Sequence, residues 1–257
     1  MHTFAKKMDA LQAIVEHRSV RKYKSDPISE DILNTILEAG MRGANTGNMQ
    51  LYSIVVTTDP AIKEQLLPLH FNQSMVKDAP VLLTFCVDVY RFSRWCEISE
   101  TEPGYDNFLM FMLASIDATI VAQNCSIVAE SFGLGTCYLG TTLYNAQEMV
   151  QVLKLPQGVF PLIALTVGYP AEIPEKTDRL PFDAVVHKET YHLPSDDEIA
   201  SYFAQKENSP FYQQFVREHQ LRNLAEVFTK IRYKQEDNIT FSKKLLTALL
   251  KMGFMNQ

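Results

Sequence analysis

The stretch MFMLASIDATIVAQNCSIVAES, residues 110–131, decides the fold because it is apolar on nearly every side. Its length predicts a helix of about six turns. A helix without a polar face must lie in a large core or at a subunit interface. A membrane span is disfavoured by its polar side chains Asp117, Gln123, Asn124 and Glu130. One domain rarely surrounds so long a helix, so we expect a dimer contact; a central helix in a monomer is the alternative.

Amphipathic helices and short apolar strands precede and follow this segment. Helical periodicity occurs at residues 6–16, 29–41 and 60–68. Strand-like runs occupy residues 51–58, 81–88, 136–141 and 160–169. Between two of these runs, residues 91–107 are polar and turn-rich, so we expect them to form an excursion over the surface.

The chain changes character after residue 190, where two further helices are predicted at 208–234 and 241–254. They are too short to form a core of their own. We therefore expect a main domain over residues 1–190. Residues 191–257 are expected to form a helical extension that packs on the body or on the partner subunit.

Composition indicates an ordinary globular protein of 257 residues, with 46% hydrophobic and 21% charged residues. The four cysteines form no C-x-x-C pair, which favours a reduced chain over a disulfide scaffold. The first residues, MHTFAKKMDALQAI, lack the apolar core of a signal peptide. We expect a soluble cytoplasmic protein with no membrane partner.

The charge distribution disfavours nucleic acid as a partner. The net charge is −6, and no basic stripe with interleaved aromatic residues occurs. Residues 201–257 hold nine Lys and Arg against five Asp and Glu. We interpret this basic part as a tail that packs on an acidic body.

A basic cluster, EHRSVRKY at residues 16–23, is unusual in this acidic chain. Arginine side chains three residues apart can point from one face of a turn and bind phosphate in a bidentate manner. The candidate donors are His17, Arg18, Ser19 and Arg21. The alternative is a solvated basic patch. A later segment, EKTDRLP, adds Lys176 and Arg179.

Two uncharged segments could contact a planar ring. The turn ANTGNMQ, residues 44–50, offers amide and hydroxyl groups suited to a neutral heterocycle, or is simply a turn with Asx chemistry. The segment GLGTCYLG, residues 133–140, lacks the spacing of a dinucleotide fingerprint and lies between a helix and a strand, the reverse of a Rossmann loop. A backbone N–H beside its last glycine could still approach a ring closely.

Common hydrolase and metal motifs are absent from the sequence. The six histidines have no H-E-x-x-H spacing, and no G-x-S-x-G elbow occurs. We therefore expect no metal site and no catalytic side chain, and infer that a cofactor carries the chemistry.

Together these pieces resemble the FMN-dependent nitroreductase family, most closely its NADPH-preferring flavin reductase and oxygen-insensitive nitroreductase branch. The motifs are, in order, HRSVRKY, ANTGNMQ, FNQSMVKDAP, ASIDATIVAQN, GLGTCYLG and LPQGVFPLIALTVGYP with DRLP. The resemblance implies an α+β fold, with a mostly antiparallel sheet flanked by helices. It also implies a domain-swapped homodimer with FMN at the subunit interface.

The resemblance also implies which residues bind FMN. His17, Arg18, Ser19 and Arg21 would hold the phosphate and the pyrimidine edge, with Arg179 as a further phosphate ligand. Asn45, Thr46 and Asn48 would come from the other subunit. Gln73 would meet the polar side of the flavin, and Tyr138, Leu139 and Gly140 would line its ring. Thr177 stands where the family often has lysine, and Lys176 is the candidate replacement.

The implied activity is hydride transfer from NADPH or NADH, through flavin N5, to a nitroaromatic, quinone or flavin acceptor by a ping-pong mechanism. One alternative is an FMN-binding member with another reductive role, such as dehalogenation or flavin supply to a partner. Another is a non-catalytic interaction protein whose basic tail binds an acidic partner.

Overall fold

The computed structural model describes residues 8–256 and divides into two compact units. The main unit comprises Met1–Glu175 and Phe241–Gln257, and the helical unit comprises Lys176–Thr240. The division of the chain into domains at residue 190 stays a prediction.

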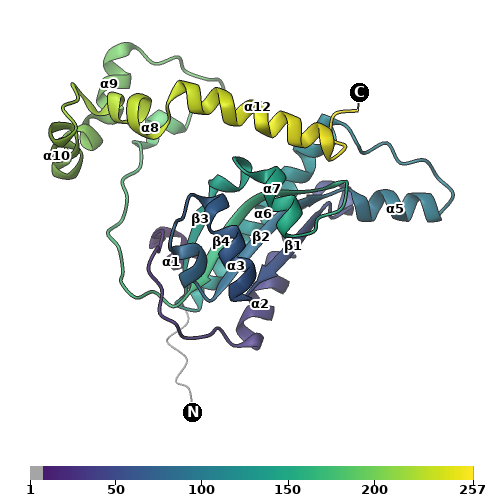
Figure 1. Ribbon diagram of the computed structural model, residues 1–257. Helices are drawn as coiled ribbons and strands as arrows, with labels where there is room; N and C mark the ends of the chain where they lie inside the picture. The colour runs from purple at the N-terminus through teal and green to yellow at the C-terminus, as the bar shows by residue number, and fades with distance from the viewer. Residues whose placement is uncertain (1–7, 257) are drawn as a thin grey trace. The chain divides into compact units, whose positions relative to one another are not determined.

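The main unit is built on one four-stranded antiparallel sheet (Figure 1). Its strands are β1 (Tyr52–Thr57), β2 (Val81–Asp88), β3 (Gly135–Leu139) and β4 (Val159–Gly168). Their order is β1-β2-β4-β3, with an irregularity in the β2–β4 register between Phe85 and Cys86. All four predicted strands are confirmed, as is the mostly antiparallel sheet flanked by helices.

Helices cover this sheet on both sides. Those of the main unit are α1 (Ala10–Val15), α2 (Glu30–Gly40), α3 (Pro60–Leu66), α4 (Met75–Asp78), α5 (Tyr90–Ile98), α6 (Phe108–Ser131) and α7 (Ala146–Val152). Three short 3₁₀ turns connect them: η1 (Thr46–Asn48), η2 (Pro68–His70) and η3 (Gly140–Leu143). The predicted helices before residue 70 are confirmed, except that residues 6 and 7 lie outside the described residues.

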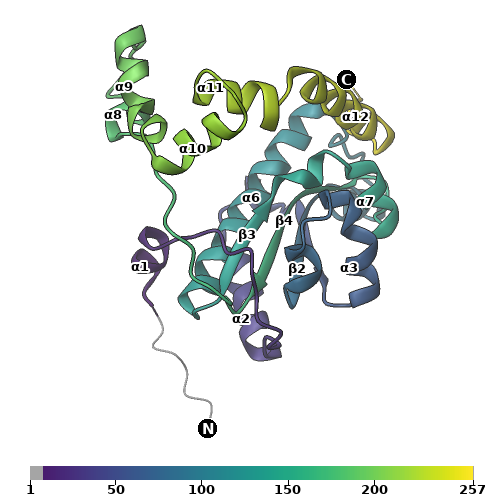
Figure 2. The same cartoon turned by 60° about the vertical axis from the view of Figure 1, so that its left-hand side comes forward.

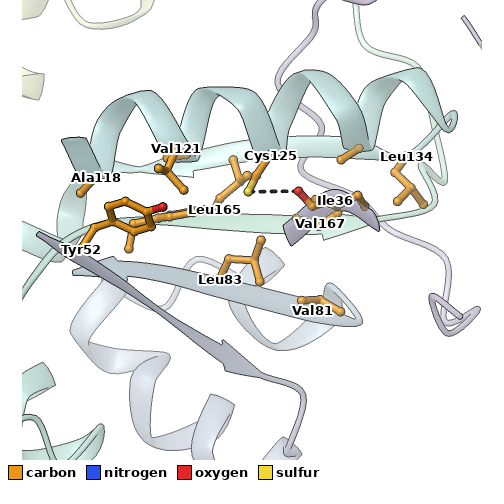
Figure 3. Packing of buried hydrophobic residues seen from close by; sticks show 13 residues of the cluster. Ile36, Tyr52, Val81, Leu83, Ala118, Val121, Cys125, Leu134, Leu165 and Val167 are labelled. Atoms are coloured by element: carbon orange, nitrogen blue, oxygen red, sulfur yellow. Dashed lines mark hydrogen bonds between the residues drawn. The ribbon is translucent and has the colours of Figure 1, made fainter. Parts of the chain in front are cut away.

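Helix α6 packs on one face of the sheet with α2 beside it (Figure 3). Alternate residues of β2, Val81, Leu83 and Phe85, face α6, because side chains alternate between the two faces of a strand. Cys125 of α6 donates its thiol to the Ile36 carbonyl of α2, with sulfur and oxygen 3.5 Å apart.

The opposite face of the sheet is covered by α3, α4 and α7 (Figure 2). Leu82 of β2 and Leu139 of β3 pack there against Leu66 and Met149. The buried ends of β3 and β4 therefore lie between two helical layers, which fixes the path of the chain where β3 ends.

Helix α6 is the one helix of the described residues that is long and apolar enough to cross a membrane by composition. It also carries the buried carboxylates Asp117 and Glu130, which hydrogen-bond to other segments of the main unit. Its packing is therefore that of a core helix. Its outer side still exposes Leu109, Met112 and Ile116.

The helical unit contains α8 (Phe182–Val185), α9 (Asp196–Glu207), α10 (Pro210–Glu218), α11 (Leu224–Glu226) and a π-helical segment, η4 (Val227–Arg232). Helix α12 (Gln235–Lys251) begins in this unit and ends in the main unit. The single helix predicted at 208–234 is wrong, because the chain leaves α10 after Glu218 and restarts at Leu224, where Asn223 caps the next helix.

Several helices were not predicted. Within the polar excursion over residues 91–107 the structure has α5, in which the rings of Phe92 and Trp95 lie 5.3 Å apart, one turn from each other. Helix α9 begins with a capping box formed by Ser195 and Glu198, a signal that was present in the sequence and overlooked.

The close contact of α2 with α6 makes a stability test possible at Gly40. A Cβ atom there would lie 2.2 Å from the Cys125 sulfur and 3.3 Å from the Val121 carbonyl oxygen. We expect Gly40→Ala to lower the free energy of unfolding by about 1–3 kcal/mol because of overpacking, as measured by urea denaturation. Gly104→Ala is the control, since a Cβ there meets nothing within 4 Å. Cys125→Ala should restore part of the loss; an additive double variant would contradict the contact.

Candidate functional site

The basic cluster, residues 16–23, runs beside the first residues of β3. Ser19 forms a parallel bridge with Thr136, and the Val20 amide donates to the Thr136 carbonyl at 2.9 Å. The Tyr23 hydroxyl donates to the Val20 carbonyl at 2.7 Å and lies 2.7 Å from the Thr166 hydroxyl. These contacts hold His17 to Arg21 against the edge strand of the sheet.

The two arginines of the cluster keep donors available for an anion. Arg18 has one long contact, 3.4 Å, from Nη2 to Glu16, and its buried Nε has no hydrogen-bond partner among residues 8–256. Arg21 is exposed, and its Nη1 lies 3.5 Å from the Ser19 carbonyl. Lys22 differs, because its ammonium group pairs with Glu172 at 2.9 Å.

A pocket of about 390 Å³ opens next to the cluster. Its wall includes Arg18 and Glu130, together with Gly133 from the turn after α6 and Gly135, the first residue of β3. Gly133 has a φ of +77° and follows the end of α6, in the left-handed conformation with which glycine commonly ends a helix.

The predicted ring-lining residues follow along the same strand. Tyr138 is half-buried, and its hydroxyl donates to Gln123 at 3.4 Å. Burial raises the pKa of this phenol, and the nearby Cys125 and Glu130 raise it further, so Tyr138 stays protonated. Leu139 is buried, whereas Gly140 is exposed and a Cβ added there would meet nothing within 4 Å. The backbone at Gly140 is therefore open to a flat group.

Gln73 lies close to this open backbone. Its side-chain nitrogen donates to the His70 carbonyl at 3.0 Å and lies 3.5 Å from the Thr141 hydroxyl. The fully buried His70 completes the contact, with Nδ1 2.8 Å from the Thr141 hydroxyl. Sequence reasoning missed His70 and Thr141, because nothing in the sequence indicates that residues 71 positions apart are in contact.

The uncharged turn 44–50 is attached to the middle of α6. One carboxylate oxygen of Asp117 accepts from the Thr46 amide at 2.8 Å and from its hydroxyl at 3.0 Å. The other oxygen of Asp117 and the side-chain oxygen of Asn45 are buried without partners among the described residues. Asn48 is exposed, with a φ of +59°.

Within one chain, this turn lies far along α6 from the basic cluster. Asp117, which holds the turn, and Glu130, which contacts His17, are 13 residues apart on one helix. At 1.5 Å per residue, their separation is roughly 20 Å along the helix axis. The structure thus brings together the basic cluster and residues 138–140 along β3. The turn that contains Asn45, Thr46 and Asn48 lies against another part of α6.

Lys176 and Arg179 belong to the helical unit. The Arg179 guanidinium donates to the Thr177 hydroxyl at 2.7 Å and to the Asp178 carbonyl at 3.0 Å. The roles of Lys176 and Arg179 as phosphate ligands stay predictions.

The residues of the main unit fit a phosphate-bearing ring compound. Two guanidinium groups and a hydroxyl can bind a phosphate, since the Nε of Arg18 is buried without a partner among the described residues. The open backbone at Gly140 can accept a planar ring. No group of three or more His, Cys, Asp or Glu in residues 8–256 could hold a metal ion.

Comparisons with known proteins agree with this description. The model of the nitroreductase family matches residues 14–169. The chain is 36% identical over 194 residues to a Bacillus subtilis protein named FMN reductase (NADPH), covering 74% of this chain and 77% of that protein. It resembles a Bacteroides fragilis crystal structure at 46% identity, with a TM-score of 0.93 and coverage of 95% and 100%. A Bacillus subtilis nitroreductase structure matches at 28% identity, with a TM-score of 0.83 and coverage of 96% and 99%.

The buried His70 makes the stability of the site depend on pH. Burial lowers its pKa from 6.5 to about 4. Between these two pH values the imidazole is protonated in the unfolded chain and neutral in the folded chain. His70 leaves the free energy of unfolding undiminished above pH 6.5 and lowers it as the pH falls toward 4. Its effect amounts to a loss of about 2 kcal/mol between pH 7 and pH 5. Urea denaturation should show that His70→Gln removes this part of the pH dependence. An unchanged slope in the variant would contradict the assignment.

Proposed function

Because the chain belongs to the nitroreductase family, we propose that it is an FMN-dependent oxidoreductase that uses NADPH or NADH to reduce nitroaromatic, quinone or flavin acceptors. The observation that carries this proposal is the arrangement along β3. The basic cluster lies at the start of this strand, and the open backbone at Gly140 follows its end. The Bacillus subtilis relative named FMN reductase (NADPH) supports the choice of cofactor and donor.

The predicted cofactor-binding residues of the main unit have roles that follow from their contacts. Arg18 and Arg21 bind the phosphate through charged donors, with Ser19 as a further donor. Gln73, held by the His70 carbonyl, presents its amide to the polar edge of the ring. When bound, FMN supplies the chemistry by accepting hydride from the nicotinamide and passing it to the acceptor in a separate half-reaction.

The ring of the cofactor is flanked by groups that carry no charge. Tyr138 stays protonated because burial raises its pKa, so it adds no negative charge beside the ring. Leu139 is buried, and the glycine that follows lets a flat group approach the backbone. These features favour a planar acceptor that stacks in the same place as the nicotinamide. Donor and acceptor would then bind there in turn, as a ping-pong mechanism requires.

The remaining predicted residues support a homodimer. Asn45, Thr46 and Asn48 are held to α6 far from the basic cluster of their own chain, so a site that uses both sets can draw one from a second chain. The exposed side chains Leu109, Met112 and Ile116 give α6 an apolar outer face suited to that contact. We propose that the two chains complete each other's site. We also propose that the protein is located in the cytoplasm.

The visible spectrum of the purified protein, together with steady-state kinetics, tests this function. We expect one FMN per chain, released by heat, and oxidation of NADPH that depends on menadione or nitrofurazone. Double-reciprocal plots at several acceptor concentrations should be parallel. A colourless protein that FMN does not reconstitute would refute the proposal.

Arg21 and Lys22 form a matched pair for testing the phosphate site. Lys22 already pairs with Glu172 at 2.9 Å, whereas the long contact of Arg21 leaves its donors for a ligand. We expect Arg21→Ala to weaken FMN binding at least about tenfold, because a charge-assisted hydrogen bond contributes about 1.5–3 kcal/mol. Lys22→Ala should change it by less than about threefold. Flavin fluorescence titration measures both; equal losses would place the phosphate elsewhere.

Ile116 tests the dimer without disturbing the core of one chain. Its side chain is 52% exposed, so arginine at this position should be tolerated in an isolated chain. We expect Ile116→Arg to give a soluble monomer with little FMN, because burying an unpaired charge opposes association and the site depends on it. Ile116→Ala should remain dimeric. Sedimentation with detection at the flavin band measures both; an Ile116→Arg monomer with full FMN would exclude a shared site.

A further inference from the structure

Glu130 is a buried carboxylate at the last turn of α6, in a segment otherwise made of apolar and small side chains. It is 7% exposed. An ionised carboxylate in such a place is unfavourable unless donors surround it. Its partners therefore indicate why it is there.

Two hydroxyl groups hold the carboxylate from the side of the core. The Thr136 hydroxyl donates to Glu130 Oε1 at 2.6 Å, and the Ser126 hydroxyl lies 2.9 Å from that of Thr136 and 3.4 Å from the same Oε1. Each hydroxyl has one proton, so Thr136 donates to Glu130 and accepts from Ser126. This chain of hydrogen bonds fixes the carboxylate between α6 and β3.

The third partner is His17, which belongs to the basic cluster. Its Nδ1 lies 2.7 Å from Glu130 Oε1. An ionised carboxylate can only accept hydrogen bonds, so this nitrogen carries a proton. The contact sets the orientation of the ring and keeps a proton on Nδ1, as carboxylates do for histidines at other functional sites. The His17 side chain remains 31% exposed, against 9% for Glu130.

We propose that Glu130 is a positioning residue that holds His17 as an imidazolium, with Nδ1–H donating to Glu130 and Nε2–H donating to the phosphate of FMN. This inference rests on the proposed function, because it assigns the phosphate to the cluster that contains His17. Glu130 acts through His17 and does not itself touch the cofactor.

Titration of FMN and of riboflavin into the flavin-free protein tests the role of Glu130. We expect Glu130→Leu to weaken FMN binding about tenfold and to leave riboflavin, which lacks the phosphate, unchanged. Glu130→Gln should stay within about threefold of the wild type, because its amide oxygen still accepts from Nδ1. Ser131→Ala is the control: it loses a partly buried hydrogen bond of 2.8 Å to the Val128 carbonyl in the same turn, and should bind FMN normally.

Two measurements distinguish positioning from a general structural effect. In a His17→Ala background, Glu130→Leu should cause no further loss of FMN affinity, because the two residues act as one unit. In ¹⁵N spectra of the imidazole rings, His17 of the FMN-bound wild type should carry protons on both ring nitrogens, and Glu130→Leu should abolish this signature.

The outcomes separate this inference from the function beneath it. Wild-type protein that fails to bind FMN would refute the proposed function. Wild-type protein that binds FMN while Glu130→Leu binds it equally well, or loses FMN and riboflavin equally, would overturn the role of Glu130 alone. Losses that add in the double variant, or an FMN-bound wild-type His17 that lacks a proton on either ring nitrogen, would also overturn it. The ¹⁵N spectrum of the FMN-bound wild type tests the state of His17 even if a variant fails to fold.

Discussion

The contact of helix α6 with the sheet is the constraint on which the rest of the main unit depends. Its inner side carries small residues, Ala114, Ala118, Ala122 and Ala129, all buried, which allow the helix to lie close to the strands. The same helix carries two buried carboxylates, and each accepts a hydrogen bond from a segment of the candidate site. Because a helix has a fixed rise per residue, the separation of those segments is set by α6.

Regular elements were predictable wherever local pattern and burial agree. The strands β2 and β4 are apolar runs buried between helical layers, and Ser29 caps α2 where the sequence indicates a helix start. Prediction failed where a helix is exposed and mixed in composition. Helix α9 has no buried residue and only weak apolar periodicity. Helix α5 buries only Cys96, and its helical spacing of Phe92 and Trp95 was missed within a segment that is polar on average.

The residues of the candidate site also differ in whether the sequence allowed them to be predicted. Ligand-type side chains close together in sequence, such as Arg18 and Arg21, could be recognised from spacing and charge. The residues that orient them could not, because their contacts join distant segments. Glu130 meets His17 across 113 residues, and His70 meets Thr141 across 71. A buried carboxylate or histidine in an apolar stretch was the one available signal, and it indicates that a partner exists without identifying it.

The burial of all four cysteines has a consequence for the proposed reduction of quinone acceptors. Quinones are electrophiles that arylate exposed thiolates, so an accessible cysteine near the acceptor would be a site of self-inactivation. Here Cys86, Cys96, Cys125 and Cys137 are all buried. Burial raises the pKa of Cys86 and of Cys125 to about 12, which keeps both as unreactive thiols. A quinone bound as the proposed acceptor would thus find all four thiols of the chain buried.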